Sequence, residues 1–204
     1  MRINKKKIFY IISTKKIEKS FYLNLKEILK LNKVSFFQLR IKNEKKKKKI
    51  LIGKKIKKIC KKYKVKFIVN DDVLLAKKLN ADGCHLGQKD MSLLKARNIL
   101  GKKIIGITCH NSIKLAKIAV KNKADYVAFG AFNFSKTKKI KYKANINLLK
   151  RSKKIIKTPI VAIGGINNDN YKKLLLNKAN FLAISGYIWN NKKLKPIEAI
   201  KKIK

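Results

Sequence analysis

The chain has 204 residues, of which 46% are apolar, and its formal net charge is +45. This length and apolar content are typical of a globular protein with a substantial core, and one domain spanning residues 1–204 is expected. No apolar run approaches the roughly 18 residues of a membrane span, and the three cysteines are scattered without a CxxC pair. Free thiols and a cytoplasmic location are therefore expected.

The positive charge comes almost entirely from lysine, since only four of the 55 basic residues are arginine. Lysine, isoleucine and asparagine share A/T-rich codons, so a base-composition bias explains a lysine-rich surface. A nucleic-acid groove would be expected to use arginine forks and stacked aromatic rings. We expect no nucleic-acid partner, and a polyanion-binding protein is the alternative.

Eight short runs of β-branched or aromatic residues follow one another along the chain. They are IFYII (8–12), VSFFQLR (34–40), VKFIVN (65–70), GCHL (83–86), KIIGIT (103–108), DYVAFG (125–130), PIVAIG (159–164) and FLAIS (181–185). Several are almost wholly apolar, as in parallel strands that are covered on both faces. Segments with helical apolar spacing separate them, for example 73–80 and 113–123, and this alternation predicts an α/β fold.

A short repeat supports the alternation, because NADG (80–83), KADY (123–126) and KANF (178–181) each close a helix and open a strand. The Asp or Asn supplies the turn. Eight units of about 25 residues predict a compact (β/α)8 TIM barrel. An open doubly wound sheet is the alternative; the first strand is not followed by GxGxxG, and polar residues follow many strands.

Two carboxylates are expected at neighbouring strand ends, Asp71 after the third run and Asp90 after the fourth. Neighbouring strands lie only about 5 Å apart, so these carboxylates repel unless a cation or a proton lies between them. One Mg²⁺ ion, also bound by a substrate phosphate, is the expected solution. Asp72 is expected to cap the following helix, and His85 to be a core or supporting residue.

Other strand ends carry groups that suit phosphate. Alternation points Gln38, Arg40 and Lys42 in one direction, toward the mouth of the barrel, and the arginine fork suits a diphosphate. Thr108 and His110, at the end of the fifth strand, could reach a substrate.

The last three strands end in a polar loop and two phosphate signals. Ser135 and Thr137 offer hydroxyls, and Lys138 offers a charge. The paired glycines at 164–165 and the Ile-Ser-Gly at 184–186 follow strands seven and eight, where barrels commonly bind phosphate.

Taken together and in order, these segments resemble those of thiamine-phosphate synthases over essentially the whole chain. The matching pieces are QLRIK (38–42), NDD (70–72), GCHLGQKD (83–90), GITCHN (106–111), TKK (137–139) and AIGGI (162–166). The resemblance implies a (β/α)8 barrel that joins a pyrimidine methyl diphosphate to a thiazole phosphate and releases pyrophosphate. It also implies a Mg²⁺-dependent, carbocation-like step that needs no protein nucleophile.

The resemblance implies a role for each matched residue. Asp71 and Asp90 would bind Mg²⁺. Contacts to the pyrimidine diphosphate would come from Gln38, Arg40, Lys42, Asn70, Thr108 and Lys138. Contacts to the thiazole phosphate would come from Ser135, Lys136, Thr137, Gly165, Ile184 and Ser185. The catalytic groups, which would stabilise charge on the leaving diphosphate, are Arg40, Lys42, Thr108 and Lys138.

The chain departs from the family pattern at a few positions. Ile41 replaces the usual Glu, Thr108 the usual Ser and Ser135 the usual Thr, and the loop GAFNFS (130–135) lacks the usual prolines. A thiazole-tautomerase-like relative, which needs neither metal nor diphosphate, and a barrel that has lost its activity are the alternatives. An oligomer is compatible with the sequence.

Overall fold

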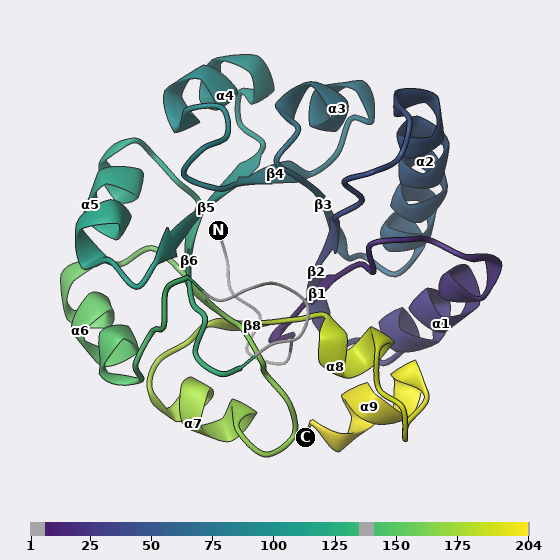
Figure 1. Cartoon of the computed structure of the whole chain (residues 1–204). Coiled ribbons are helices and arrows are strands. Elements are labelled where there is room, and N and C mark those ends of the chain that lie inside the picture. Colours follow the sequence, from purple (N-terminus) through teal and green to yellow (C-terminus); the bar gives the residue numbers. More distant parts are fainter. Residues whose placement is uncertain (1–6, 135–140, 204) are drawn as a thin grey trace.

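The computed structural model describes residues 7–134 and 141–203, which form a closed barrel of parallel strands ringed by helices (Figure 1). The strands are β1 Phe9–Ile12, β2 Val34–Leu39, β3 Lys66–Asn70, β4 Gly83–Leu86, β5 Ile104–His110, β6 Tyr126–Phe129, β7 Ile160–Ile163 and β8 Phe181–Ile184. Each strand pairs with its neighbour in sequence, and β1 closes the barrel on β8. The (β/α)8 prediction is confirmed, and the open sheet is excluded.

Helices follow the strands around the outside of the barrel (Figure 1). They are α1 Lys19–Lys30, α2 Lys46–Lys62, α3 Val73–Lys78, α4 Leu93–Leu100, α5 Ile113–Lys121, α6 Asn147–Ile155, α7 Tyr171–Leu176, α8 Gly186–Trp189 and α9 Pro196–Lys202. Asp72 caps α3, as predicted, because its Oδ1 accepts a hydrogen bond of 2.8 Å from Leu75 N. No helix among the described residues is long and apolar enough to cross a bilayer.

Strand alternation divides the core into two parts. The outer core lies between the strands and the helices and includes Phe37 of β2 and Leu25 of α1. The inner core fills the barrel and includes Tyr10, Phe36 and Phe181, whose aromatic rings pack at centroid distances near 5 Å. The barrel is therefore a packed core and not a pore.

The repeated Ala-Asp/Asn turns share one structure. The residue before each Ala has a positive φ, at 46° for Asn80, 65° for Lys123 and 78° for Lys178. The residue after each Ala accepts a hydrogen bond from the backbone of an earlier strand, in the pairs Asp82–Phe67 N (2.9 Å), Asp125–Ile105 N (2.8 Å) and Asn180–Ile160 N (2.8 Å). The repeat thus ties each turn to the preceding strand of the barrel.

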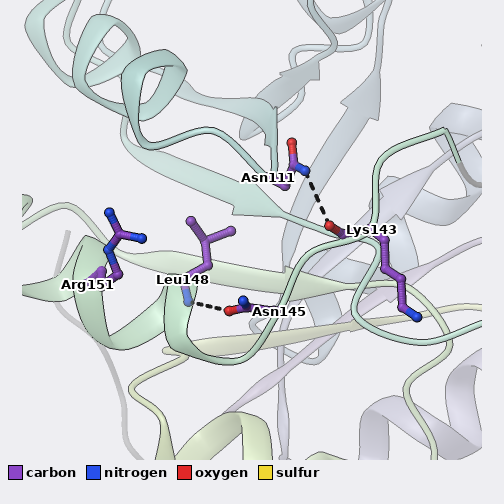
Figure 2. Close-up of a pocket in the computed structure, with 5 residues that line it drawn as sticks. All are labelled: Asn111, Lys143, Asn145, Leu148 and Arg151. Atoms are coloured by element: carbon purple, nitrogen blue, oxygen red, sulfur yellow. Dashed lines mark hydrogen bonds between the residues drawn. The ribbon is translucent and has the colours of Figure 1, made fainter.

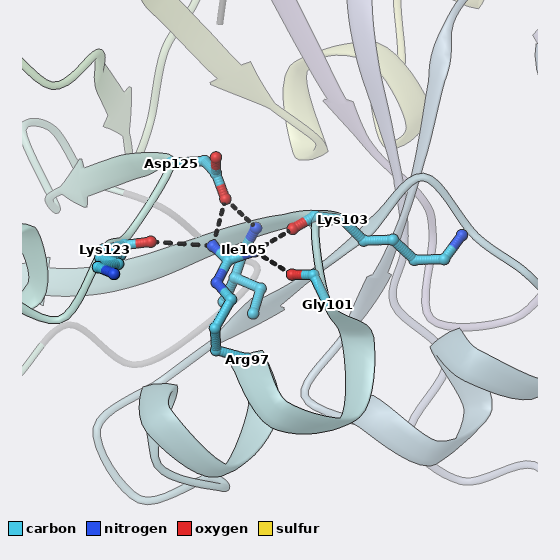
Figure 3. Close-up of polar contacts among 6 residues, drawn as sticks. All are labelled: Arg97, Gly101, Lys103, Ile105, Lys123 and Asp125. Atoms are coloured by element: carbon cyan, nitrogen blue, oxygen red, sulfur yellow. Dashed lines mark hydrogen bonds and ion pairs between the residues drawn. The ribbon is translucent and has the colours of Figure 1, made fainter.

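Arg97 of α4 reinforces one of these turns (Figure 3). Its guanidinium donates hydrogen bonds to the carbonyl oxygens of Gly101, Lys103 and Lys123, and it pairs with the Asp125 carboxylate at 2.7 Å. These contacts join α4 to the segments that open β5 and β6. One of the few arginines therefore has a structural role.

Candidate functional site

The carboxyl ends of the strands bring most of the predicted site residues to one end of the barrel. We call this end the mouth. It receives residues from the ends of β2, β3, β4, β5, β7 and β8. Four predicted residues, Ser135, Lys136, Thr137 and Lys138, lie outside the described residues.

The two predicted metal ligands meet at the mouth, between β3 and β4. Partial burial raises the pKa of Asp90, and both a hydrogen bond and the charge of the Asp71 carboxylate raise this pKa further. The N–H of Gly87, 2.7 Å from Asp90 Oδ2, and the charge of Lys42 act in the opposite direction. Lys42 Nζ also lies 3.3 Å from Asp71 Oδ2. The two acids are close enough to share a proton or a cation.

The acid pair is suited to a hard cation that keeps further ligands from water or substrate. Among the described residues, no group of three or more His, Cys, Asp or Glu side chains could hold a metal. Two carboxylates without a third protein ligand are the kind of site through which Mg²⁺ binds a substrate phosphate. The donor set therefore fits the ion that the sequence predicts.

Backbone geometry also marks the mouth. Among the described residues, five non-glycine residues with positive φ lie just after helices, where a left-handed residue is common. Two others lie at strand ends, Asp71 with φ 63° and His110 with φ 52°. Asp71 is held there by a 2.8 Å hydrogen bond from its N–H to the carbonyl oxygen of His85. Such conformations cluster at functional sites.

An amide pair lies on the barrel wall beside the acids. Gln38 is 3% exposed, and its Nε2 donates a hydrogen bond of 2.9 Å to Asn70 Oδ1. An amide group has two donor hydrogens and an acceptor oxygen, so each residue keeps hydrogen-bonding capacity for a heterocycle. Ile41 is buried in the outer core, which explains why an apolar residue can replace the usual Glu there.

Ser13 is a residue of the mouth that sequence reasoning missed. It directly follows β1, its Oγ accepts a hydrogen bond of 2.9 Å from Arg40 N, and its carbonyl oxygen accepts one of 3.3 Å from Ser185 Oγ. Ser13 thus links the ends of β1, β2 and β8. The available signal was its place as the first polar residue after the first strand.

The paired glycines after β7 serve the protein's own packing. Gly164 and Gly165 have φ values of 105° and 59°, and a Cβ on Gly165 would lie 2.1 Å from the carbonyl oxygen of Phe134. The glycine turn therefore packs closely against the segment that follows β6. Ile184, at the end of β8, is 1% exposed, so its backbone is the part that could meet a ligand.

Thr108 ends a row of interior hydrogen bonds. His85 Nε2 lies 2.8 Å from Thr108 Oγ1, and His85 Nδ1 lies 2.9 Å from Tyr126 Oη. Burial lowers the pKa of His85 to about 4, so the imidazole is neutral at pH 7. The prediction that His85 is a core or supporting residue is confirmed.

The cysteines are not arranged for nucleophilic catalysis. Cys60, Cys84 and Cys109 are free and buried, as expected, and burial raises the pKa of each thiol. A thiol in this state is a poor nucleophile. The ring of His110 stacks on that of Tyr142 at a centroid distance of 4.1 Å.

A small pocket lies beside the mouth, between the end of β5 and α6 (Figure 2). Its volume is about 170 Å³, and it is lined by Asn111, Lys143, Asn145, Leu148 and Arg151. Asn111 donates a hydrogen bond to the carbonyl oxygen of Lys143, and Asn145 Oδ1 accepts one from Leu148 N. None of these residues belongs to the predicted site.

Comparisons with known proteins agree with one another. A family model described as thiamine monophosphate synthase matches residues 8–188. A thiamine-phosphate synthase from Pelagibacter ubique (strain HTCC1062) is 66% identical over 207 residues and covers 100% of both chains. One from Erythrobacter litoralis (strain HTCC2594) is 38% identical, covering 93% of this chain and 92% of its own. The solved structure of a thiamine phosphate pyrophosphorylase from Pyrococcus furiosus superposes with a TM-score of 0.86 at 29% identity, covering 98% of this chain and 94% of its own.

Proposed function

The chain belongs to the thiamine monophosphate synthase family, and from this premise we propose how the mouth of its barrel joins two substrates. Its activity is that of a thiamine-phosphate synthase, a transferase of thiamine biosynthesis that acts on small molecules. The observation that carries the site assignment is the pair Asp71 and Asp90 beside Lys42, at the ends of adjacent strands.

In the proposed reaction, the exocyclic methylene carbon of the pyrimidine loses its bond to a diphosphate oxygen and gains one to the thiazole nitrogen. Both electrons of the broken bond leave with pyrophosphate, and the nitrogen supplies the pair for the new bond. Bond breaking runs ahead of bond making, so positive charge develops on the pyrimidine. No protein nucleophile takes part, in keeping with the buried thiols.

We assign the metal site to Asp71 and Asp90, which would hold one Mg²⁺. An ion bound there would neutralise charge on the departing diphosphate. The raised pKa of Asp90 supports this assignment. Two neighbouring carboxylates repel each other when both are ionised, and a cation shared between them removes this repulsion.

The diphosphate side of the mouth uses the chain's own cations and hydroxyl. Lys42 lies against Asp71, Arg40 precedes Lys42 by two residues just after β2, and Thr108 presents its hydroxyl from β5. These groups would stabilise the charge that grows on the leaving group. Lys138 would complete the set from outside the described residues. The Gln38–Asn70 amide pair would orient the pyrimidine ring.

The thiazole phosphate would bind across the ends of β7 and β8. Backbone N–H groups at Gly165 and Ile184 would be donors there, and the hydroxyl of Ser185 would exchange its bond to the Ser13 carbonyl oxygen for one to the phosphate. Ser135, Lys136 and Thr137 would close the same side from the segment outside the described residues. Holding the thiazole nitrogen against the pyrimidine carbon supplies much of the rate through proximity.

The test is an assay of the purified protein with both substrates, with and without Mg²⁺. We expect thiamine phosphate and pyrophosphate in equal amounts, and neither product when the ion is removed by a chelator. If no pyrophosphate is released in the presence of Mg²⁺, the synthase mechanism is wrong, and a thiazole-tautomerase-like activity and a barrel that has lost its activity are the alternatives.

We also propose a cytoplasmic location and no nucleic-acid partner. Some of the lysines line a groove of about 430 Å³ between α2 and α3. Its lining consists mainly of Lys54, Lys57, Lys58, Lys61 and Lys78. The groove is made of flexible lysine side chains, with no arginine or aromatic ring in its lining. Tight nucleic-acid binding at physiological salt would contradict this proposal.

A further inference from the structure

Four side chains form a continuous row of hydrogen bonds from the inner core to the mouth. Tyr10 Oη lies 2.7 Å from Tyr126 Oη, which lies 2.9 Å from His85 Nδ1, and His85 Nε2 lies 2.8 Å from Thr108 Oγ1. Tyr126 is 0% exposed, Tyr10 2% and His85 9%. We call these four residues the interior row.

The row is built into the register of the barrel. Gly106 of β5 pairs with His85 of β4 on one side and with Tyr126 of β6 on the other. A Cβ at Gly106 would lie 1.9 Å from the Cζ atom of Tyr126, so only glycine leaves room for this ring. The rings of His85 and Tyr126 then stack with centroids 5.6 Å apart and planes 15° apart.

A neutral imidazole has one N–H, so the row can run in only two directions. With the proton on Nδ1, His85 donates to Tyr126 and Tyr126 donates to Tyr10. The hydroxyl hydrogen of Tyr10 is then left without an acceptor, because Tyr126 is its only hydrogen-bond partner among the described residues. Apolar inner-core side chains such as Phe36 surround it. An unsatisfied buried donor of this kind is costly.

With the proton on Nε2, each donor in the row has an acceptor. Tyr10 donates to Tyr126, Tyr126 donates to His85 Nδ1, and His85 Nε2 donates to Thr108 Oγ1. The O–H of Thr108 is the last donor of the row and is left for a ligand. Satisfaction of the buried donors therefore selects this direction.

We propose that the interior row is a positioning device that holds His85 as its Nε2–H tautomer and so presents Thr108 as a hydrogen-bond donor to a diphosphate oxygen. A donor suits an anionic acceptor, whereas the opposite direction would turn a lone pair of Thr108 toward it. The inference rests on the proposed function and adds Tyr10, Tyr126 and His85 to it as positioning residues.

The first test needs no substrate. Protein labelled with ¹⁵N-histidine is studied by two-bond ¹H–¹⁵N correlation spectra, which distinguish a protonated ring nitrogen from an unprotonated one. The signals that disappear in His85→Gln are assigned to His85, and the remaining ones belong to His110. We expect the proton on Nε2. A proton on Nδ1 in the wild-type protein would overturn the proposal.

The second test compares Tyr126→Phe with Tyr171→Phe. Tyr171 of α7 is also buried, at 2% exposure, but lies in the outer core away from the row, so it is a matched control for loss of a phenol hydroxyl. In Tyr126→Phe we expect the single-tautomer signature to be lost and kcat to fall about 10-fold, with KM for the thiazole phosphate unchanged. Tyr171→Phe should retain both the signature and kcat.

Equal effects of the two substitutions on kcat, or an unchanged tautomer in Tyr126→Phe, would show that the row does not position Thr108. The proposed function fails separately, if the wild-type protein forms no thiamine phosphate. Even then, the spectrum of the wild-type protein shows which ring nitrogen of His85 carries the proton and so gives the direction of the hydrogen bonds in the row. This result does not depend on whether Tyr126→Phe folds.

Discussion

Asp71 and Asp72 are neighbours in sequence with different tasks. Asp72 turns its carboxylate back to Leu75 N and caps α3, whereas Asp71, in a left-handed conformation, joins Asp90. The left-handed turn at Asp71 separates the two side chains. Sequence reasoning made the same division, because a residue that directly precedes a helix is the expected cap.

Replacing either proposed metal ligand tests this division. We expect Asp71→Asn and Asp90→Asn each to lower turnover at least about 100-fold, because each removes one of the two charges that would hold the ion. Asp72→Asn is the matched control, since asparagine caps a helix about as well as aspartate. Steady-state assays of thiamine phosphate formation check all three. Wild-type turnover in Asp71→Asn would mean that the site is not in use.

His85 makes stability depend on pH. Its folded pKa of about 4 lies below the ordinary value of 6.5, so the unfolded chain binds more protons between these values. The free energy of unfolding should therefore fall as pH drops from about 6.5 to 4, by at most about 1.4 kcal/mol per pH unit. Urea titrations across this range measure the slope. His85→Gln should make the slope shallower, and an unchanged slope would contradict the assignment.

At the scale of elements, the Ala-Asp/Asn turn was recognised in the sequence but its partners were not. The sequence showed that 80–83, 123–126 and 178–181 share a pattern, and turn chemistry explained the Asp or Asn. The acceptor role toward Phe67, Ile105 and Ile160 depends on strand pairing, which brings together residues 15 to 20 positions apart. No local pattern specifies that pairing.

The turn at Asp125 should be the most sensitive of the three to substitution. Asp125→Ala removes the bond to Ile105 N and also leaves the Arg97 guanidinium without its carboxylate, whereas Asn180→Ala removes one backbone contact. We expect the free energy of unfolding to fall by about 2–4 kcal/mol in Asp125→Ala and by about 1 kcal/mol in Asn180→Ala. Chemical denaturation of both variants measures the difference. Equal losses would contradict a stabilising role for Arg97.

Strand limits were predicted to within about two residues. The largest difference is β5, which the run KIIGIT places at 103–108 and which extends from Ile104 to His110. Cys109 is buried and its Sγ donates a hydrogen bond to the carbonyl oxygen of Ile107, and His110 pairs with Phe129 of β6. The β-branched run in the sequence ends at Thr108. In the structure the register of β5 against β6 shifts between Thr108 and His110, and the strand continues through this irregularity to His110.

At the scale of the whole molecule, the proposed ion and the diphosphate should act as ligands that stabilise the folded state. Mg²⁺ with inorganic pyrophosphate should raise the Tm of the wild-type protein, because a ligand that binds only the native state adds to its stability. A hundredfold excess over Kd corresponds to about 2.7 kcal/mol.

The same experiment on Asp90→Asn should give a much smaller rise in Tm. Mg²⁺ alone and pyrophosphate alone are the controls, since the proposed site needs both the carboxylates and the phosphate oxygens. Differential scanning fluorimetry measures all of these conditions. An equal rise in Asp90→Asn would place the ion elsewhere.

The sequence by itself determined the fold class, the order of the elements and the acids at the ends of β3 and β4. These features follow from hydrophobic periodicity, turn residues and polar residues at strand ends, all of which are local patterns. The family resemblance added the roles of the matched residues, because motif order along the whole chain is specific even where each motif is short.

Only the tertiary structure decided which side chains meet across the barrel. It made Ser13 a link between β1, β2 and β8, placed Ile41 in the outer core, and joined Tyr10 and Tyr126, which are 116 positions apart, through one hydrogen bond. These contacts depend on strand register and on the closure of β1 on β8. Register is a relation between distant segments, and the packing of the entire core fixes it.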